Sequence, residues 1–587
     1  MPNVTTPLLA DSDRSDNDAG VNRNSRSDQS PSSTHGSFWQ TRLREVILFV
    51  WAFVATAAVI VLAAWSQHRG QTDGSHSPAN AKRNLIFMVS DGMGPASLSL
   101  TRSFRQHVNG LPIDDVLTLD RHFWGSSRTR SSNSLVTDSA AGATAFSCGL
   151  KSYNGAISTL PDHSPCGTVL EAAKRAGYTT GLVVTTDITD ATPACFASHV
   201  DYRSQNDEVA AQEVGEGPLG RVVDLMFGGG RCHFLPNTTE GSCRADDVDI
   251  TKIAREQHGW NYIDSRGGFD ALREGHNVDL PTLGLFAPTD IPFEIDRRNQ
   301  SDIYPSLSEM AKTALRALEK ATANTDKGFF LMIEGSRIDH AGHINDPAAQ
   351  VREVIEYDNA FKAVLDFLER SEDDGLLVAT SDHETGGLSV ALQEPGHYPV
   401  YNWYPEALKR ASASCERLTQ RLAAHVSSNP DTTASVDGRI KLRNWINETL
   451  VYEGLGITNA NDLELSALVA QPENALVIFA EMISLRAHVG WSTHGHSAVD
   501  VNVYSSGGPA AEKIRGNVEN TDIGKFLADY LNLADGVQAI TKELNAQRSS
   551  KSIKAVPEMV GQEELLGYQA KGLPKNWGSL EGAQLHL

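Results

Sequence analysis

Cysteine is scarce in this sequence, and basic residues are outnumbered by acidic ones. The 587 residues include six cysteines and no Cys-x-x-Cys pair, which argues against a disulfide scaffold and a thiolate zinc cluster. Lys and Arg number 51 against 73 Asp and Glu, and the net charge of −22 argues against a nucleic-acid-binding protein. Because this charge also repels anionic substrates, attraction for phosphate would require a local cationic site such as bound metal.

One pair of cysteines lies close together in the sequence. Cys232 and Cys243 flank a short segment that contains Pro236, Asn237 and Gly241. Closure of this loop by a disulfide is expected in an oxidising lumen. The alternative is that these thiols are unpaired and buried.

A hydrophobic tail of the kind that signals a lipid anchor is missing from the last fifty residues. One apolar segment, residues 46–67, carries no formal charge and is long enough to span a bilayer. We therefore predict a transmembrane signal-anchor helix there. A cleaved signal peptide is the weaker alternative, because roughly 45 mostly polar residues precede the segment.

The anchor divides the chain into parts with different compositions. Asn-x-Ser/Thr acceptors at Asn237, Asn299 and Asn447 follow the anchor, which predicts a cytoplasmic N-terminus and a luminal bulk. We predict the following parts: a disordered tail over 1–45, a linker over 68–82, a globular domain over 83–535 with a surface insertion at about 395–488, and a C-terminal segment over 536–587.

Several short apolar runs in the globular domain end at an acidic residue. These runs suit strands buried on both faces, and helical patterns such as 308–320 and 350–368 lie between them. Strands that alternate with helices indicate an α/β sandwich with a mostly parallel sheet. The carboxyl ends of the strands should meet at one edge, with the acidic residues that follow them: Asp91, Asp187, Glu334 and Asp382. Several buried acids in one place would need cations to hold them.

Three clusters that contain histidine have the residue types of zinc ligands. Asp339 and His343 stand four residues apart, which places both on one face of a helical turn. Asp382 and His383 form a second pair, and His494 lies in another His-rich turn. Carboxylate and imidazole groups suit Zn²⁺. A single histidine is more often structural, but three such clusters favour metal binding.

Ser139 precedes a run of small residues with good helix content, Ala140 to Ala145. At a helix N-terminus, free N–H groups and the helix dipole favour an anion such as a phosphoryl group. The simpler interpretation is that Asp138 or Ser139 only caps the helix and that the small residues allow close packing.

Taken together, these motifs resemble the alkaline phosphatase family over roughly residues 83–535. The segment from Val136 to Ala145 resembles the family's nucleophile signature, and Arg203 lies where the family places its phosphate-binding arginine. The other matching motifs are Asp91-Gly92-Met93-Gly94, Asp190-Ala191-Thr192-Pro193 and, in the family's order, Glu334, Asp339, His343, Asp382, His383 and His494.

This resemblance implies a three-layer α/β/α sandwich and a phosphomonoesterase with Ser139 as nucleophile. It implies two zinc ions and one magnesium ion, with Arg203 and His340 at the bound phosphate. By the resemblance, one zinc takes Asp339, His343 and His494, the other takes Asp91, Asp382 and His383, and magnesium takes Asp91, Asp190, Thr192 and Glu334. For His340 the alternative is that it only packs beside the ligand helix.

The anchored arrangement is most similar to that of the fungal vacuolar alkaline phosphatases. It implies a single-pass type II protein of the vacuole membrane, a homodimer, a glycoprotein, and a C-terminal propeptide over 536–587. Two alternatives stay open. One is a related metallohydrolase such as a phosphodiesterase or sulfatase, although no Cys/Ser-x-Pro-x-Arg motif occurs near Ser139. The other is an inactive luminal interaction module.

Overall fold

The computed structural model describes residues 38–72, 82–394 and 396–550, in two units, Met1–His76 and Ser77–Leu587. Among its described residues, the first unit contains one helix, α1 (Phe38–Thr72). The segment Glu45–Leu62 of this helix has a mean hydropathy of 2.5, and none of its residues is buried. The helix includes the predicted span of 46–67, and residues 38–45, which were assigned to the disordered tail, are helical. The rest of the predicted tail and most of the linker lie outside the described residues.

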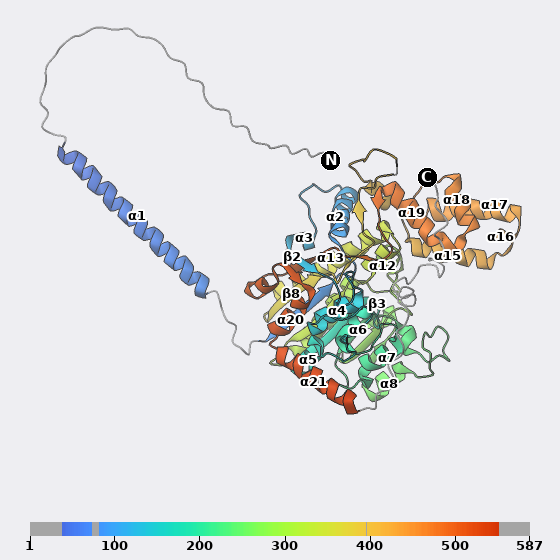
Figure 1. Cartoon of the computed structure of the whole chain (residues 1–587), viewed down its shortest axis with the longest axis horizontal. Coiled ribbons are helices and arrows are strands. Elements are labelled where there is room, and N and C mark those ends of the chain that lie inside the picture. Colours follow the sequence, from blue (N-terminus) through green and yellow to red (C-terminus); the bar gives the residue numbers. More distant parts are fainter. Residues whose placement is uncertain (1–37, 73–81, 395, 551–587) are drawn as a thin grey trace, which may run out of the picture. The chain divides into compact units, whose positions relative to one another are not determined.

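The second unit is built on a ten-stranded sheet, as the α/β prediction requires (Figure 1). Its order is β14-β2-β13-β8-β1-β7-β3-β4-β6-β5, and its pairs are parallel except those made by β13 with β2 and β8. The strands are β1 (Arg83–Val89), β2 (Phe123–Arg128), β3 (Thr179–Asp187), β4 (Leu225–Gly229), β5 (Asn261–Ile263), β6 (Thr282–Leu285), β7 (Phe329–Glu334), β8 (Asp374–Thr380), β13 (Val501–Ser505) and β14 (Gly516–Glu519).

Alternate residues of the central strands enter two separate cores. In β1, Leu85, Phe87 and Val89 belong to one core, and Ile86 and Met88 belong to the other. Side chains of a strand point alternately to the two faces, so a strand covered by helices on both sides must be apolar throughout. This explains the continuous apolar runs and confirms the three layers.

Helices cover both faces of the sheet. The first core contains residues of α4 (Ser139–Cys148), α5 (Val169–Arg175), α6 (Ala191–Ala197) and α20 (Asn520–Tyr530). The second contains residues of α11 (Leu307–Thr322) and α13 (Pro347–Arg370), where helical patterns were predicted. The remaining helices of this part are α2 (Pro95–Asn109), α3 (Thr118–Arg121), α7 (Asn206–Ala211), α8 (Ile250–Gln257), α9 (Arg266–Ala271), α10 (Glu294–Arg297) and α12 (Arg337–His343).

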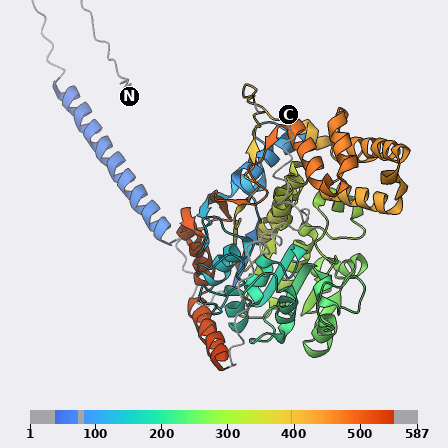
Figure 2. The ribbon, with the colours of Figure 1, turned by 45° about the vertical axis from the view of Figure 1, so that its right-hand side comes forward.

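A group of helices lies where the insertion at about 395–488 was predicted, and it shares a core with residues of α2, α10, α12 and α13. Figures 1 and 2 show most of these helices gathered at one end of the unit, away from the sheet. Their buried residues include Leu418, Leu450 and Phe479. The short strands β10 (Ser389–Val390) and β11 (Val489–Gly490) pair where the group begins and ends. The helices are α14 (Pro405–Arg410), α15 (Cys415–Ser428), α16 (Asp431–Ala434), α17 (Val436–Trp445), α18 (Asp462–Ala470) and α19 (Ala475–Ala487).

Two disulfides close loops in this unit. The predicted bond between Cys232 and Cys243 is present, and a second bond, between Cys148 and Cys166, was not predicted. The alternative of unpaired thiols is therefore wrong for Cys232 and Cys243, whereas Cys195 and Cys415 are buried and free.

The folded part extends past residue 535, where the globular domain was predicted to end. Helix α21 (Ala534–Ser550) packs on α5, and its Ile540 and Leu544 are buried in the first core. The Thr541 hydroxyl accepts a hydrogen bond of 2.8 Å from the backbone N–H of Gly167. Residues 536–550 are therefore part of the packed structure, and residues 551–587 lie outside the described residues.

We expect replacement of Ile540 by Ala to lower the free energy of unfolding by about 2–5 kcal/mol, because it leaves a cavity in a packed core. Lys542→Ala on the same helix is the control, since Lys542 is exposed. Urea unfolding of the two variants and the parent protein measures the difference. Equal urea midpoints for the two variants would show that the packing of α21 contributes little to the stability of the protein.

Candidate active site

Three acidic residues gather at the carboxyl edge of three neighbouring strands. Asp91 follows β1, Glu334 ends β7 and Asp382 follows β8, and β1 lies between the other two strands. Burial, and then the charges of Asp382, Asp339 and Glu334, raise the pKa of Asp91 well above its ordinary value. The predicted gathering of acids is confirmed for these residues. Asp187, which ends β3, instead lies 3.7 Å from Nε2 of His233.

The first candidate metal group consists of Asp91, Asp382 and His383. Their ligand atoms lie within 4.8 Å of one another, and all three residues are buried. Nε2 of His383 is 3.4 Å from Oδ1 of Asp91 and 3.2 Å from Oδ2 of Asp382. Neither of these carboxylate oxygens accepts a hydrogen bond from the described residues. Buried carboxylates need compensation, so the group fits a bound cation.

The second candidate metal group consists of Asp339, His343 and His496, which also lie within 4.8 Å of one another. Nε2 of His343 is 3.2 Å from Oδ2 of Asp339 and 3.1 Å from Nε2 of His496. Nδ1 of each imidazole faces a backbone carbonyl, His494 for His343 and Thr137 for His496. If each Nδ1 carries the proton and donates to its carbonyl, the Nε2 atoms of His343 and His496 both direct a lone pair at the centre of this candidate metal group. Metal-ligating histidines have the same arrangement.

His494, the predicted third member of this group, lies outside it. Its Nδ1 is 2.8 Å from the backbone oxygen of His343. The reason is strand pairing, because β12 (His496–Ser497) pairs with β9 (Glu384–Thr385) and places His496 opposite Thr385. The Thr385 hydroxyl in turn donates to Oδ1 of Asp339. The sequence shows two histidines in one turn, but only the pairing decides which one joins the group.

Ser139 is the first residue of α4, as predicted, and it is buried. Its Oγ is 3.0 Å from Nε2 of His383, a member of the first metal group. Asp138 caps the helix by accepting a hydrogen bond from the N–H of Ala141. A Cβ on Gly142 would come within 2.9 Å of Cβ of Asp382, so the small residues do allow close packing. Capping and close packing are what bring Ser139 to the metal group.

Arg203 lies beside the N-terminus of α4. Its Nη2 donates to Oδ1 of Asp190 at 2.9 Å, and its Nη1 is 3.5 Å from Oδ2 of Asp138. Burial opposes its charge, but Asp190 and Asp138 raise the pKa of Arg203 above its ordinary value. Its Nε–H has no hydrogen-bond partner among the described residues, so a donor is available for an anion.

The predicted magnesium ligands Asp190, Thr192 and Glu334 come from three places at the same edge. Asp190 caps α6, Thr192 is in its first turn, and Glu334 ends β7. Burial raises the pKa of Glu334 to about 8, with a hydrogen bond from Ser336 opposing and the charge of Asp190 adding to the increase. The carboxylates of Asp190 and Glu334 are therefore near enough to interact, although Asp190 is also paired with Arg203.

His340 contacts neither Ser139 nor Arg203 by any hydrogen bond between described residues. Its Nδ1 is 3.3 Å from Oδ2 of Asp290 and accepts a hydrogen bond of 3.3 Å from Nε of Arg337. Burial opposes the protonated form, and Asp290 raises the pKa of His340 above its ordinary value. A role of His340 at the bound phosphate stays a prediction.

Comparison with known proteins shows which family this chain is similar to. A family model described as alkaline phosphatase matches residues 82–533. The chain is similar to the repressible alkaline phosphatase of Saccharomyces cerevisiae, at 55% identity over 78% of this chain and 82% of that protein. It is also similar to an alkaline phosphatase of Schizosaccharomyces pombe, at 45% identity over 86% and 90%.

Solved structures show the same fold. The crystal structure of a cold-active alkaline phosphatase from a psychrophilic Shewanella matches with a TM-score of 0.61 and 31% identity. The match covers 76% of this chain and 99% of that chain. The Thermus thermophilus enzyme matches with a TM-score of 0.63 and 26% identity, over 81% and 99%.

Proposed function

The chain belongs to the alkaline phosphatase family, and on this basis we propose that it hydrolyses phosphate monoesters through a phosphoseryl intermediate on Ser139. The observation that carries the proposal is the position of Ser139, at a helix N-terminus and 3.0 Å from a histidine of the first metal group. Free N–H groups at such a terminus favour a phosphoryl anion.

The two metal groups and the third acidic set fit the cations that the family uses. Asp91, Asp382 and His383 would hold one zinc ion, Asp339, His343 and His496 the other, and Asp91, Asp190, Thr192 and Glu334 a magnesium ion. When bound, these ions would supply Lewis-acid stabilisation of the oxygens that gain charge during phosphoryl transfer. An aspartate at position 190 favours hard, water-rich Mg²⁺ coordination more than an imidazole would.

The chain's own residues position the ester and accept the phosphoryl group. Arg203 can bind non-bridging phosphate oxygens with its planar guanidinium, and Asp190 and Asp138 hold it beside Ser139. Oγ of Ser139 attacks phosphorus, the ester P–O bond breaks, and the proton of Ser139 leaves with the alcohol by way of water. A water molecule then cleaves the Oγ–P bond, which releases phosphate and restores the serine.

Trapping the intermediate tests the proposed function directly. Holoenzyme incubated with a labelled monoester and quenched at mildly acidic pH should carry one phosphoryl group per chain, and peptide mapping should place it on Ser139. A parallel assay with a phosphodiester and a sulfate ester should give much lower rates. Label on another residue, or a preference for either alternative ester, would contradict the proposal.

Measurement of the metal content tests whether His496, rather than the predicted His494, is a zinc ligand. We expect His496→Ala to lose about one zinc ion per chain and at least about 100-fold in kcat/KM, because each catalytic metal supplies several kcal/mol. His494→Ala is the matched control, since His494 lies two residues away and its ring nitrogens face the backbone oxygen of His343 and the side chain of Asn345. Elemental analysis and kinetics of both variants measure the difference. A greater zinc loss in His494→Ala would restore His494 as the ligand.

We also propose that the protein is a homodimeric glycoprotein anchored as a single-pass type II protein in the vacuole membrane. The apolar helix α1 supports the anchor, and the exposure of Asn237, Asn299 and Asn447 supports a luminal domain. Protease protection and a glycosidase-induced mass shift test the topology, and sedimentation of the detergent-solubilised protein tests the dimer. Digestion of the catalytic domain in intact vacuoles would contradict this orientation.

A further inference from the structure

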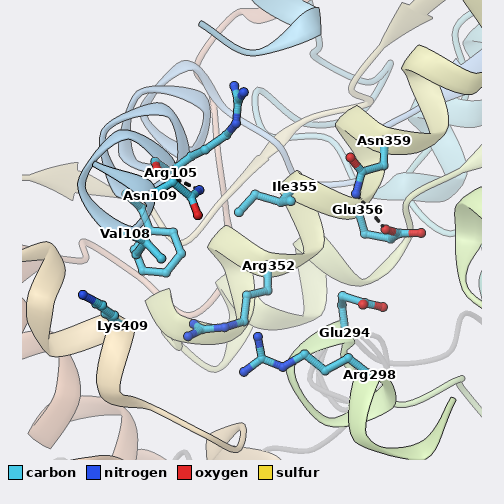
Figure 3. A pocket seen from close by; sticks show the side chains of 11 residues that line it. Arg105, Val108, Asn109, Glu294, Arg298, Arg352, Ile355, Glu356, Asn359 and Lys409 are labelled. Carbon is cyan, nitrogen blue, oxygen red and sulfur yellow. Dashed lines mark hydrogen bonds between the residues drawn. The ribbon is translucent and has the colours of Figure 1, made fainter. Parts of the chain in front are cut away.

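A basic pocket of about 280 Å³ lies between α2, α13, α14 and the turn after α10 (Figure 3). It shares no residue with the candidate active site. Its polar and charged lining consists of Arg105, Arg298, Arg352, Lys409, Glu294, Glu356, Asn109 and Asn359. Four basic side chains in one pocket stand out in a chain with a net charge of −22.

The two acidic residues of the pocket are bound to other groups. Both carboxylate oxygens of Glu294 accept hydrogen bonds from Arg297, at 2.5 and 2.9 Å. Glu356 accepts from the N–H of Ser308 at 2.9 Å and from Nδ2 of Asn359 at 3.1 Å. Neither makes a salt bridge with a basic residue that lines the pocket, within the described part of the chain.

Arg352 is a buried cation that forms no salt bridge with any described residue. Its side chain donates to the backbone oxygens of Ala348, Leu408 and Ala411, at 2.7, 3.0 and 3.2 Å. No carboxylate lies within salt-bridge distance of it in the described ranges. Burial, and then repulsion by Arg298, lower the pKa of Arg352 to about 10, although the charges of Asp346 and Asp296 act in the opposite direction.

Arg298 faces Arg352 from the exposed side of the pocket. Figure 3 shows the ends of the two side chains close together. Arg298 forms no salt bridge with any residue that the structure describes, whereas Arg105 is paired with Asp115 and Lys409 with Glu406. Two guanidinium groups that repel each other in a partly buried pocket lack a counter-anion between them.

We propose that the pocket between Arg298 and Arg352 binds a phosphate-class oxyanion, free or as the phosphoryl group of a small molecule. A tetrahedral dianion matches the two positive charges and offers oxygens to a guanidinium on each side, whereas a carboxylate presents both oxygens in one direction. Lys409, which is paired with Glu406, also lines the pocket. The pocket's volume limits the bound group to a small one.

The number of phosphate ions bound by the holoenzyme tests this site. In equilibrium dialysis with labelled inorganic phosphate, the parent protein should bind two per chain, one at the active site and one in the pocket. Arg298→Gln should lose one of them, or bind it at least tenfold more weakly, and should keep its kcat. Arg255→Gln is the matched control, since Arg255 is an exposed arginine on α8 that hydrogen-bonds only the backbone oxygen of Thr251.

Competition and a second readout separate the remaining outcomes. Sulfate should displace the pocket phosphate and acetate should not. Phosphate should also slow modification of Arg298, and not of Arg255, by an arginine-specific reagent. One phosphate per parent chain, equal binding by both variants, or equal displacement by acetate would overturn the proposal. So would loss of dimers in Arg298→Gln with an unchanged phosphate count, because the anion would then be a carboxylate of a second copy.

Discussion

Replacement of Ser139 by Ala is expected to lower kcat by at least about 1000-fold, since loss of a nucleophile removes the covalent route and leaves only binding and electrostatic contributions. The protein should remain folded. Ser139 is buried among small residues of α4, so removal of one oxygen opens little space, and the helix cap is made by Asp138. Among the side chains that the structure describes, its hydroxyl contacts that of His383.

Ser147→Ala is the matched control for this variant. Ser147 is a buried serine of the same helix, and its hydroxyl contacts Thr144 and Ser158 rather than a metal group. Steady-state kinetics and thermal melting of both variants, with metal content measured in parallel, give the comparison. A Ser139→Ala enzyme within tenfold of the parent rate would show that the hydroxyl is not the nucleophile.

Removal of metal by a strong chelator is expected to abolish turnover and to lower the melting temperature together. Asp91, Glu334, Asp339 and Asp382 are buried at one edge, and without cations they repel one another. A ligand that binds only the native state stabilises it by about 4 kcal/mol per site at a thousand times its Kd. For several sites we expect a fall on the order of 5 °C or more.

Add-back of metal distinguishes this effect from damage by the chelator. Zinc and magnesium together should restore both activity and melting temperature, and calcium alone should restore neither, because its coordination suits larger, all-oxygen sites. Calorimetry and rate assays on the same samples provide the measurement. Unchanged melting after removal of all zinc, confirmed by elemental analysis, would mean that the clustered acids are stable by themselves.

The strands and most of the site could be predicted because their signals are local. The apolar runs before Asp91, Glu334 and Asp382 show buried parallel strands, and in such a sheet the strand ends share one edge. Ser139 followed by small residues likewise indicates a helix start. Each of these inferences depends on a few consecutive residues.

The features that were missed depend on contacts between distant segments. His496, and not His494, lies in the second candidate metal group because β12 pairs with β9, and nothing within the turn itself distinguishes the two histidines. Cys148 and Cys166 are eighteen residues apart. Turn signals such as Asn154-Gly155 and Pro161-Asp162 lie between them, but these signals do not show that the loop returns to Cys148. Helix α21 is amphipathic only to a small degree, and its place is set by Ile540 entering a core made by residues far away in the sequence.

The pairing of β10 with β11 has a consequence for how this protein can change over evolution. The chain enters the segment that carries the extra helices after Val390 and leaves it at Val489, which pairs directly opposite Val390. A segment whose two ends are neighbours can lengthen, shorten or be exchanged without moving the rest of the chain. Only six residues after Gly490, however, the chain reaches His496. Variation between the two strands is thus constrained at its return point, where a slip of one residue would displace a candidate metal ligand.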